Sequence, residues 1–204
     1  MPPIRVLIAD DHVVVRRGIR ALLSTEPDTE VIGETSNGLE TVALAQSLNP
    51  DVILMDLIMP QMNGVEATRQ IAGMQLHMHI LVLTSFAADD QVLPAIKAGA
   101  HGCLLKDSSP ADLVQAIRQV HQGEVFLPPV IAFQIIQELS AAVPRHEPHL
   151  TLTERELDVL LLVVQGLSVQ DIADLLHMDA HTVRIHVRHA LDTFHRMNRH
   201  QGTR

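Results

Sequence analysis

The chain has no tyrosine and no tryptophan, one cysteine, Cys103, and only two lysines, Lys97 and Lys106, among its 204 residues. A single cysteine excludes an internal disulfide and any cysteine-based zinc site. No apolar run approaches the roughly 20 residues that a membrane-spanning helix needs. The opening residues, MPPIRVLIADDH, lack the long apolar core of a secretory signal. Together these absences favour a cytoplasmic protein with no membrane partner.

Charge of either sign is modest and unevenly spread. Charged residues make up 19% of the chain and hydrophobic residues 47%, which is typical of a packed protein rather than a disordered one. Residues 1–124 hold 8 basic and 15 acidic side chains, a net charge of −7. Residues 125–204 hold 7 basic and 9 acidic side chains, a net charge of −2, with 8 of the 13 histidines. The chain as a whole therefore lacks the net positive charge that is typical of nucleic-acid-binding proteins. The difference in net charge between its two parts indicates two units with different partners.

The first 120 residues alternate short apolar runs with amphipathic stretches. The predicted strands are 4–9, 30–35, 52–55, 80–83 and 103–105, and the predicted helices are 13–23, 39–48, 65–74, 89–98 and 110–121. Nearly continuous apolar strands between amphipathic helices are typical of a parallel sheet that is covered on both faces. We therefore expect an α/β domain over residues 1–124, a doubly wound five-stranded parallel sheet.

The pattern changes after residue 124. Residues 130–139 favour a helix, and the polar, proline-containing stretch 141–149 completes a predicted linker over 125–150. From Thr151 onward the pattern is helical only. Predicted helix starts are a capping box at Thr153 and Glu156, a second start at Ser168 to Asp171, and Asp179 ahead of a helix from Ala180 to about Phe194. Three helices with a tight turn predict a small all-α helix-turn-helix domain over residues 151–204.

Polar side chains stand where the predicted strands end. Asp10 and Asp11 follow the first strand, Asp56 the third, Thr84 the fourth and Lys106 the fifth. The carboxyl ends of parallel strands share one edge of a sheet, so these groups converge. Clustered carboxylates with only oxygen ligands favour a hard cation such as Mg²⁺. A lysine and a hydroxyl beside that ion suit a phosphoryl group, and a carboxylate can itself accept one.

Each of these residues also has an ordinary explanation when it is taken alone. An acidic pair after a strand often caps the next helix, so Asp11 could cap the helix that begins at Val13. A single lysine such as Lys106 is usually a solvated charge. Five polar residues at the expected strand ends are harder to explain in that way.

Residues 4–123 resemble the receiver domain of bacterial two-component response regulators, through the motifs RVLIADDH, DVILMDLIMPQMNG, ILVLTS and GCLLKD. The resemblance implies that Asp56 accepts a phosphoryl group from a sensor histidine kinase. It implies that Asp11, Asp56 and the backbone carbonyl of Ile58 bind Mg²⁺, with Asp10 acting directly or through water. Lys106 would then hold the phosphoryl group, and Thr84 would be the hydroxyl that moves toward it. Pro60 and Gly64 match the family's loop after the acceptor.

Two features depart from common receivers. The family usually has an aromatic residue three positions before the lysine, where this chain has Cys103. A coupled movement of threonine and aromatic ring is therefore not expected. The positions two residues after Asp56 and Thr84 are Ile58 and Phe86. Because such positions flank the path of the hydrolytic water, their apolar side chains predict slow loss of the phosphoryl group.

Residues 151–201 resemble the LuxR/NarL-type helix-turn-helix, through the LTxRE start, the GLS turn, the DIA segment and TVxxHV. The resemblance makes 180–194 the recognition helix, with Arg184, Ile185 and Arg188 as base readers. Arg184 and Arg188 share one helix face, arginine can bind guanine, and isoleucine can contact a thymine methyl. The implied contacts to the DNA phosphates are Ser168, Gln170, Thr182 and His186. The family usually continues into a fourth helix, and we expect this domain to lack it.

The resulting hypothesis is a transcription regulator, not an enzyme, in which phosphorylation of Asp56 controls homodimerisation and binding to double-stranded DNA. Several alternatives stay open. The C-terminal helices could form a plain bundle with solvated arginines, or His186 and His189, three residues apart, could bind a metal. The first domain could be a Mg²⁺-dependent phosphohydrolase, although Ile58 stands where a general acid would be needed. It could also be a pseudo-receiver that acts by protein contact alone.

Overall fold

The computed structural model describes residues 2–74, 77–85, 90–141 and 152–201. The chain divides into two compact units, Met1–Phe126 and Leu127–Arg204. The strands of the first unit are β1 (Ile4–Ala9), β2 (Thr29–Thr35), β3 (Val52–Asp56), β4 (His79–Thr84) and β5 (Gly102–Leu105). Its helices are α1 (Val13–Leu23), α2 (Gly38–Leu48), α3 (Gly64–Gly73), α4 (Val92–Ala98) and α5 (Pro110–His121). The second unit holds α6 (Pro129–Ala141), α7 (Glu154–Val164), α8 (Val169–Leu176) and α9 (Ala180–Gln201).

All strands of the first unit are parallel, in the order β2-β1-β3-β4-β5, which confirms the predicted doubly wound sheet. The strand order reverses direction at β1, whose neighbours are β2 and β3. In an open α/β sheet, ligands bind at such a switch point, outside the carboxyl ends of the strands. Because Ala9 is paired with Met55, the residues that follow β1 lie directly beside Asp56 at the end of β3.

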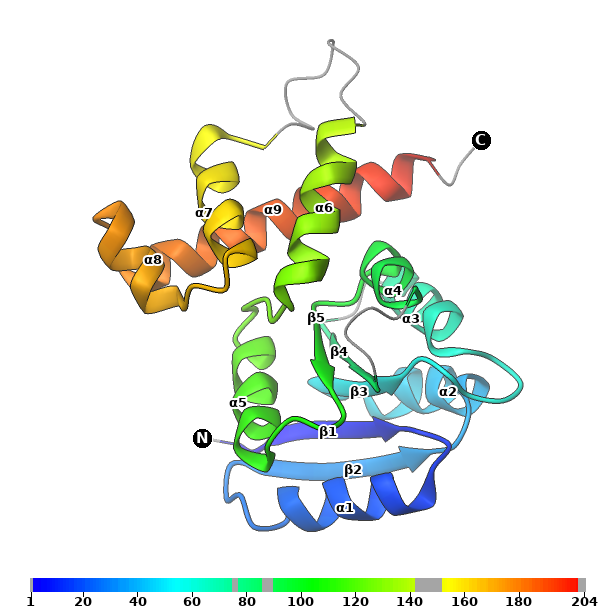
Figure 1. Ribbon diagram of the computed structural model, residues 1–204. Coiled ribbons are helices and arrows are strands. Elements are labelled where there is room, and N and C mark those ends of the chain that lie inside the picture. Colours follow the sequence, from blue (N-terminus) through cyan, green and yellow to red (C-terminus); the bar gives the residue numbers. More distant parts are fainter. Residues whose placement is uncertain (1, 75–76, 86–89, 142–151, 202–204) are drawn as a thin grey trace. The chain divides into compact units, whose positions relative to one another are not determined.

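Helices cover both faces of this sheet (Figure 1). Side chains alternate between the two faces of a strand, so each strand must be apolar on both. On the face covered by α1 and α5, the buried cluster includes Val6, Ile8, Leu54, Leu81, Leu104 and Ile117. Their strand neighbours Leu7, Ile53, Met55, Val82 and Cys103 are also fully buried and belong to the opposite face, that of α2, α3 and α4. This double burial explains the unbroken apolar runs of the sequence.

The helices of the first unit begin at the predicted residue or within three residues of it. Asn37 accepts a hydrogen bond from the backbone N–H of Glu40 at the start of α2, and Asn63 does the same for Glu66 in α3. The largest shift is at α4, which begins at Val92 rather than at Asp89. Residues 86–89 lie outside the described residues.

The second unit is an all-α bundle, as predicted. Ile136 of α6, Leu160 of α7 and Ala190 of α9 form its buried centre. Both predicted capping boxes are present, Thr153 with Glu156 and Ser168 with Asp171, and Asp179 accepts the backbone N–H of Thr182. Every helix in the described part of the chain is too short or too polar to span a bilayer.

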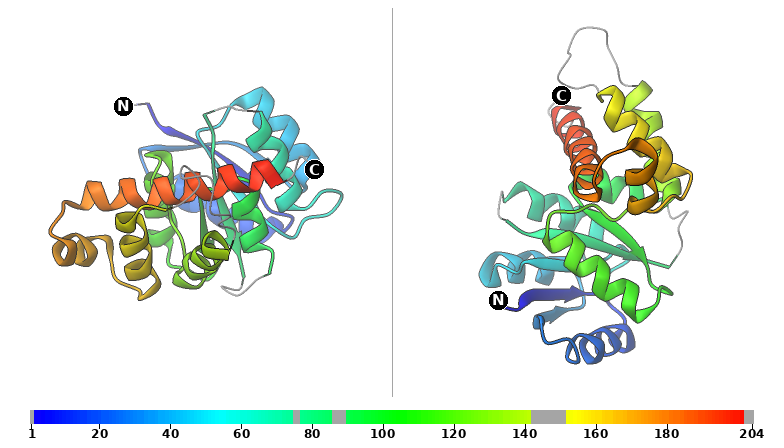
Figure 2. Two further views of the ribbon diagram at one scale, coloured as in Figure 1. Left: turned by 90° about the horizontal axis from the view of Figure 1, so that it is seen from above. Right: turned by 90° about the vertical axis from the view of Figure 1, so that its left-hand side faces the viewer.

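The predicted end of the recognition helix near Phe194 was wrong, because α9 continues to Gln201 as one helix (Figures 1 and 2). No glycine or proline occurs between Ala180 and Gln201. Its buried stripe also continues past the predicted end, with Phe194 fully buried and Met197 only 9% exposed. A periodic apolar stripe without a helix breaker favours continuation of the helix.

Strand β4 begins with a buried histidine that affects stability as the pH falls. Burial lowers the pKa of His79 below its ordinary value of 6.5, and the nearby His121 and His77 lower it further. The backbone and the charge of Asp51 oppose this change. The ring of His79 packs edge-on against His101, with 4.8 Å between centroids, and Nδ1 of His101 accepts the backbone N–H of Ile80. An additional proton on His79 therefore has no favourable place in this packing.

Because the unfolded chain binds that proton more readily, we expect the free energy of unfolding to fall as the pH drops below 6.5 toward the lower folded value. Urea unfolding of the full chain between about pH 8 and 5.5 measures this slope. His79→Gln should flatten it, whereas His181→Gln, a change at an exposed histidine of α9, should leave it as it is. An identical slope in wild type and His79→Gln would contradict this expectation.

Candidate functional site

Two carboxylates and one lysine meet at the carboxyl edge of the sheet. Asp10 is fully buried and Asp56 is 4% exposed. The Nζ atom of Lys106 lies 2.7 Å from Oδ2 of Asp10 and 3.1 Å from Oδ2 of Asp56. Strands β1, β3 and β5 each supply one of these groups at their ends, as the order of the strands requires. One ammonium group thus bridges two buried carboxylates.

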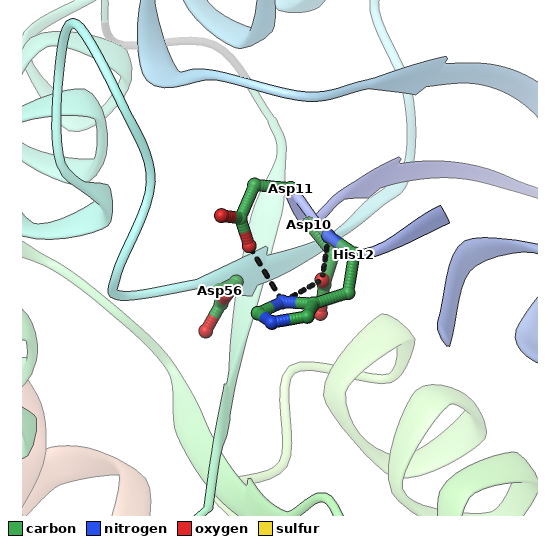
Figure 3. A group of neighbouring side chains, drawn as sticks. All are labelled: Asp10, Asp11, His12 and Asp56. Carbon is green, nitrogen blue, oxygen red and sulfur yellow. Dashed lines mark hydrogen bonds and ion pairs between the residues drawn. The ribbon is translucent and has the colours of Figure 1, made fainter. Parts of the chain in front are cut away.

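Asp11 and His12 complete the group on its exposed side. Figure 3 shows the imidazole of His12 facing the carboxylates of Asp10 and Asp11, with Asp56 beside them. Nδ1 of His12 lies 2.6 Å from Oδ1 of Asp11 and 3.4 Å from Oδ1 of Asp10. The N-cap of α1 is His12, which makes no side-chain cap bond, so the alternative in which Asp11 caps this helix was wrong. Sequence reasoning missed His12, although it directly follows the acidic pair.

The pocket carries an excess of negative charge. Burial raises the pKa of Asp56, and the neighbouring Asp10 adds to the increase, while Lys106 opposes it. Burial alone would lower the pKa of Lys106, but its hydrogen bonds to Asp10 and Asp56 raise it above the ordinary value. The lysine therefore stays charged at neutral pH. Three carboxylates stand against one ammonium, and a second cation would be strongly attracted.

The ligand atoms of four of these side chains are close enough to one another to hold a metal ion. Asp10, Asp11, His12 and Asp56 each offer a ligand atom, and these atoms all lie within 4.8 Å of one another. An oxygen-rich donor set fits Mg²⁺, which commonly takes one or two carboxylates together with waters and phosphate oxygens. Within the described ranges this is the only such group. His189 has one carboxylate nearby, with Oε1 of Glu156 at 3.8 Å from its Nδ1, but these two residues and His186 do not form a comparable group of donors.

The loop after Asp56 is built by close backbone contacts. The N–H of Gly64 donates to the carbonyl of Leu57 at 2.9 Å, and the N–H of Gly38 donates to the carbonyl of Met62 at 3.0 Å. A Cβ on Gly64 would lie 2.0 Å from the backbone oxygen of Asp56. The backbone N–H of Ile58 bonds to Asp56, and its side chain is 64% exposed. The metal contact of the Ile58 carbonyl stays a prediction.

Thr84 and Cys103 lie on the two strands at the β5 edge of the sheet. Thr84 ends β4, is 2% exposed, and its carbonyl accepts the backbone N–H of Lys106 at 2.7 Å. Cys103 is fully buried, and its backbone N–H donates to the carbonyl of Phe126 at 2.7 Å. Cys103, which stands where the family usually has an aromatic residue, is thus linked by a backbone hydrogen bond to Phe126, the last residue of the first unit. Phe86, the other position named for slow hydrolysis, lies outside the described residues.

The predicted DNA-contacting residues occupy the starts of α8 and α9. Arg188 is exposed, and Arg184, Ile185 and His186 are half-buried. The hydroxyl of Ser168 donates to Asp171 at 2.6 Å, and that of Thr182 donates to Asp179 at 2.7 Å. Gln170 donates to Asp174 at 3.2 Å. Three of the four predicted phosphate contacts therefore already fix local helix structure, and their contacts to DNA stay predictions.

Comparison with known families agrees with both units. Residues 6–118 match the family described as "Response regulator receiver domain", and residues 150–204 match "Bacterial regulatory proteins, luxR family". The chain belongs to the response regulators that join a receiver domain to a LuxR-type DNA-binding domain.

Similar proteins match almost the whole chain. The transcriptional regulatory protein LiaR of Bacillus subtilis is 45% identical over 188 residues, which cover 92% of this chain and 89% of LiaR. The response regulator protein VraR of Staphylococcus aureus is 41% identical over 199 residues, covering 98% of this chain and 94% of VraR. A crystal structure of the response regulator ChrA of a heme-sensing two-component system gives a TM-score of 0.57, with 32% identity over 98% of this chain and 99% of ChrA.

Proposed function

We propose that phosphorylation of Asp56 by a sensor histidine kinase switches this regulator into its DNA-binding form. The observation that carries the proposal is the position of Lys106 between the buried carboxylates of Asp10 and Asp56, 2.7 Å and 3.1 Å away. If Asp56 gains a phosphoryl group, the ammonium group of Lys106 is already close enough to pair with one of the phosphoryl oxygens. The family membership and the similarity to the transcriptional regulators LiaR and VraR support a role in transcription.

The chemistry assigns a role to each group at the edge of the sheet. An oxygen of Asp56 attacks the phosphorus of a phosphohistidine, so that an oxygen–phosphorus bond forms as the nitrogen–phosphorus bond breaks and the histidine nitrogen takes up a proton. Lys106 then pairs with a phosphoryl oxygen, and the hydroxyl of Thr84 donates to another. Asp10, Asp11, Asp56 and the backbone carbonyl of Ile58 would hold Mg²⁺. That ion supplies positive charge against the carboxylates and the phosphoryl oxygens.

On the DNA side, Arg184, Ile185 and Arg188 would contact bases. Ser168, Gln170, Thr182 and His186 would contact phosphates, and the backbone N–H groups at the starts of α8 and α9 would add to these contacts. Phosphorylation would shift an existing equilibrium toward a homodimer that binds two half-sites. The backbone bond between Cys103 and Phe126 offers a route from β5 to the segment that leads to α6, without an aromatic switch.

The test is phosphorylation by acetyl phosphate with Mg²⁺, followed by intact mass and peptide mapping. Wild type should gain one phosphoryl group at Asp56, and Asp56→Asn should gain none. Asp107→Asn, a change at the exposed acidic residue after Lys106, is the matched control and should behave as wild type. Because Ile58 is apolar, the added mass should persist well beyond seconds after the donor is removed.

Two outcomes would replace the proposal by its alternatives. If wild type gains no mass at Asp56, the pseudo-receiver hypothesis takes its place. If the chain turns over simple phosphate esters through Asp56, the phosphohydrolase hypothesis takes its place. Loss of the phosphoryl group within seconds would contradict the role given to Ile58.

A further inference from the structure

His12 and Lys106 contact different oxygen atoms of the three clustered aspartates, Asp10, Asp11 and Asp56. Lys106 pairs with Oδ2 of Asp10 and Oδ2 of Asp56. Nδ1 of His12 faces Oδ1 of Asp11 at 2.6 Å and Oδ1 of Asp10 at 3.4 Å. The oxygens turned away from the lysine are the ones that would face a metal ion; Oδ1 of Asp10 also accepts the backbone N–H of His12 at 2.8 Å and keeps a second lone pair for the ion. The imidazole is therefore on the side of the pocket where the ion would be bound.

The four donors are so close together that small side-chain movements would bring them into one coordination sphere. Donor atoms lie about 2.0–2.2 Å from a small divalent ion, so two donors on opposite sides of it are about 4.2 Å apart. The ligand atoms of Asp10, Asp11, His12 and Asp56 all lie within 4.8 Å of one another. The side chain of His12 is 66% exposed, so its ring can adjust without displacing packed neighbours.

We propose that His12 is a nitrogen ligand of the divalent ion at this site and gives the pocket a preference for Mn²⁺ over Mg²⁺. The inference rests on the proposed function, which puts a divalent ion among the three aspartates. An imidazole nitrogen is a good ligand for first-row transition metals, whereas Mg²⁺ keeps oxygen ligands and its own waters. Loss of the imidazole should therefore weaken Mn²⁺ binding more than Mg²⁺ binding.

The experiment uses Mn²⁺ as the probe in the full-length chain. Electron paramagnetic resonance of free Mn²⁺ gives its affinity, and competition with Mg²⁺ gives the ratio of the two affinities. Pulsed resonance of the bound ion detects the modulation of a directly bound nitrogen. Because the chain has 13 histidines, Asp11→Asn defines the background binding, and His121→Ala is the matched control for removal of an exposed histidine.

Wild type and His121→Ala should show nitrogen modulation at a site that Asp11→Asn has lost. His12→Ala should lose that modulation, and its preference for Mn²⁺ over Mg²⁺ should fall by roughly tenfold, because the nitrogen ligand favours Mn²⁺ while Mg²⁺ is held by oxygen ligands. Bound Mn²⁺ without nitrogen modulation in wild type, or the same modulation in His12→Ala, would overturn the inference. In that case, phosphorylation of wild type with Mg²⁺ would leave the proposed function standing. Failure of wild type to be phosphorylated would instead overturn the proposed function.

Discussion

Lys106→Met is expected to lower the free energy of unfolding of the first unit by about 3 kcal/mol. The change keeps the apolar stem but leaves Asp10 and Asp56 buried without a counter-charge, and losing one partner of a buried ion pair typically costs about 3–5 kcal/mol. We expect the lower end of that range because the Lys106 side chain is 17% exposed. Urea unfolding at neutral pH measures the loss.

The same variant should show a characteristic pH dependence. Burial and Asp10 raise the pKa of Asp56, while Lys106 and, less strongly, the backbone N–H of Ile58 lower it, so removing Lys106 raises that pKa further. The folded variant then binds a proton more readily than the unfolded chain, and part of the lost stability should return between about pH 7 and pH 5. Arg17→Met, a change at an exposed basic residue of α1, is the matched control and should show neither effect. An equal loss of stability at both pH values would contradict the assigned ion pairs.

Gly64→Ala is expected to damage both the stability of the first unit and the phosphorylation of Asp56. The new Cβ would lie 2.0 Å from the oxygen and 2.9 Å from the carbonyl carbon of Asp56, and 2.9 Å from Cα of Leu57. These are backbone atoms of the acceptor loop, so the loop itself must move. Overpacking of this kind costs about 1–3 kcal/mol, against about 1 kcal/mol that alanine gains over glycine in a helix.

Because the carbonyl that must move belongs to Asp56, we expect phosphorylation by acetyl phosphate to slow by roughly tenfold or more. Gly73→Ala is the matched control, since Gly73 lies at the other end of α3 and a Cβ there meets nothing within 4 Å. That variant should be phosphorylated like wild type and be as stable or slightly more stable. A Gly64→Ala chain with wild-type stability and rate would show that the loop is not held in the way described.

The sequence predicted most of the fold because its apolar runs are determined by burial on both faces of a parallel sheet. The same reasoning brought Asp10, Asp56 and Lys106 together, since each directly follows or ends a strand and the strands are parallel. The strand order could not be read from the apolar pattern alone. His12 was missed for a local reason. Its contact with Asp11 depends on the turn between β1 and α1, which strand and helix periodicity do not describe.

The second unit shows where pattern reasoning fails in a different way. The end of α9 was placed near Phe194 although no helix breaker is present there, and the buried Met197 extends the apolar stripe. Residues chosen for contact with DNA phosphates also take part in helix starts: Ser168 caps α8, and Thr182 donates its hydroxyl to Asp179, which caps α9. A sequence motif does not separate these two roles, because a helix start that binds a phosphate needs the same residues as a helix start that is simply capped.

The central claim is that phosphorylation of Asp56 controls DNA binding. It is tested most directly by gel shift on DNA selected from a random pool, with and without acetyl phosphate and Mg²⁺. The donor should raise the affinity of wild type and Asp107→Asn by roughly tenfold or more. It should leave Asp56→Asn at its basal affinity, while Arg188→Ala should bind weakly in both conditions. Equal affinity of wild type with and without the donor, or a full response in Asp56→Asn, would contradict the account.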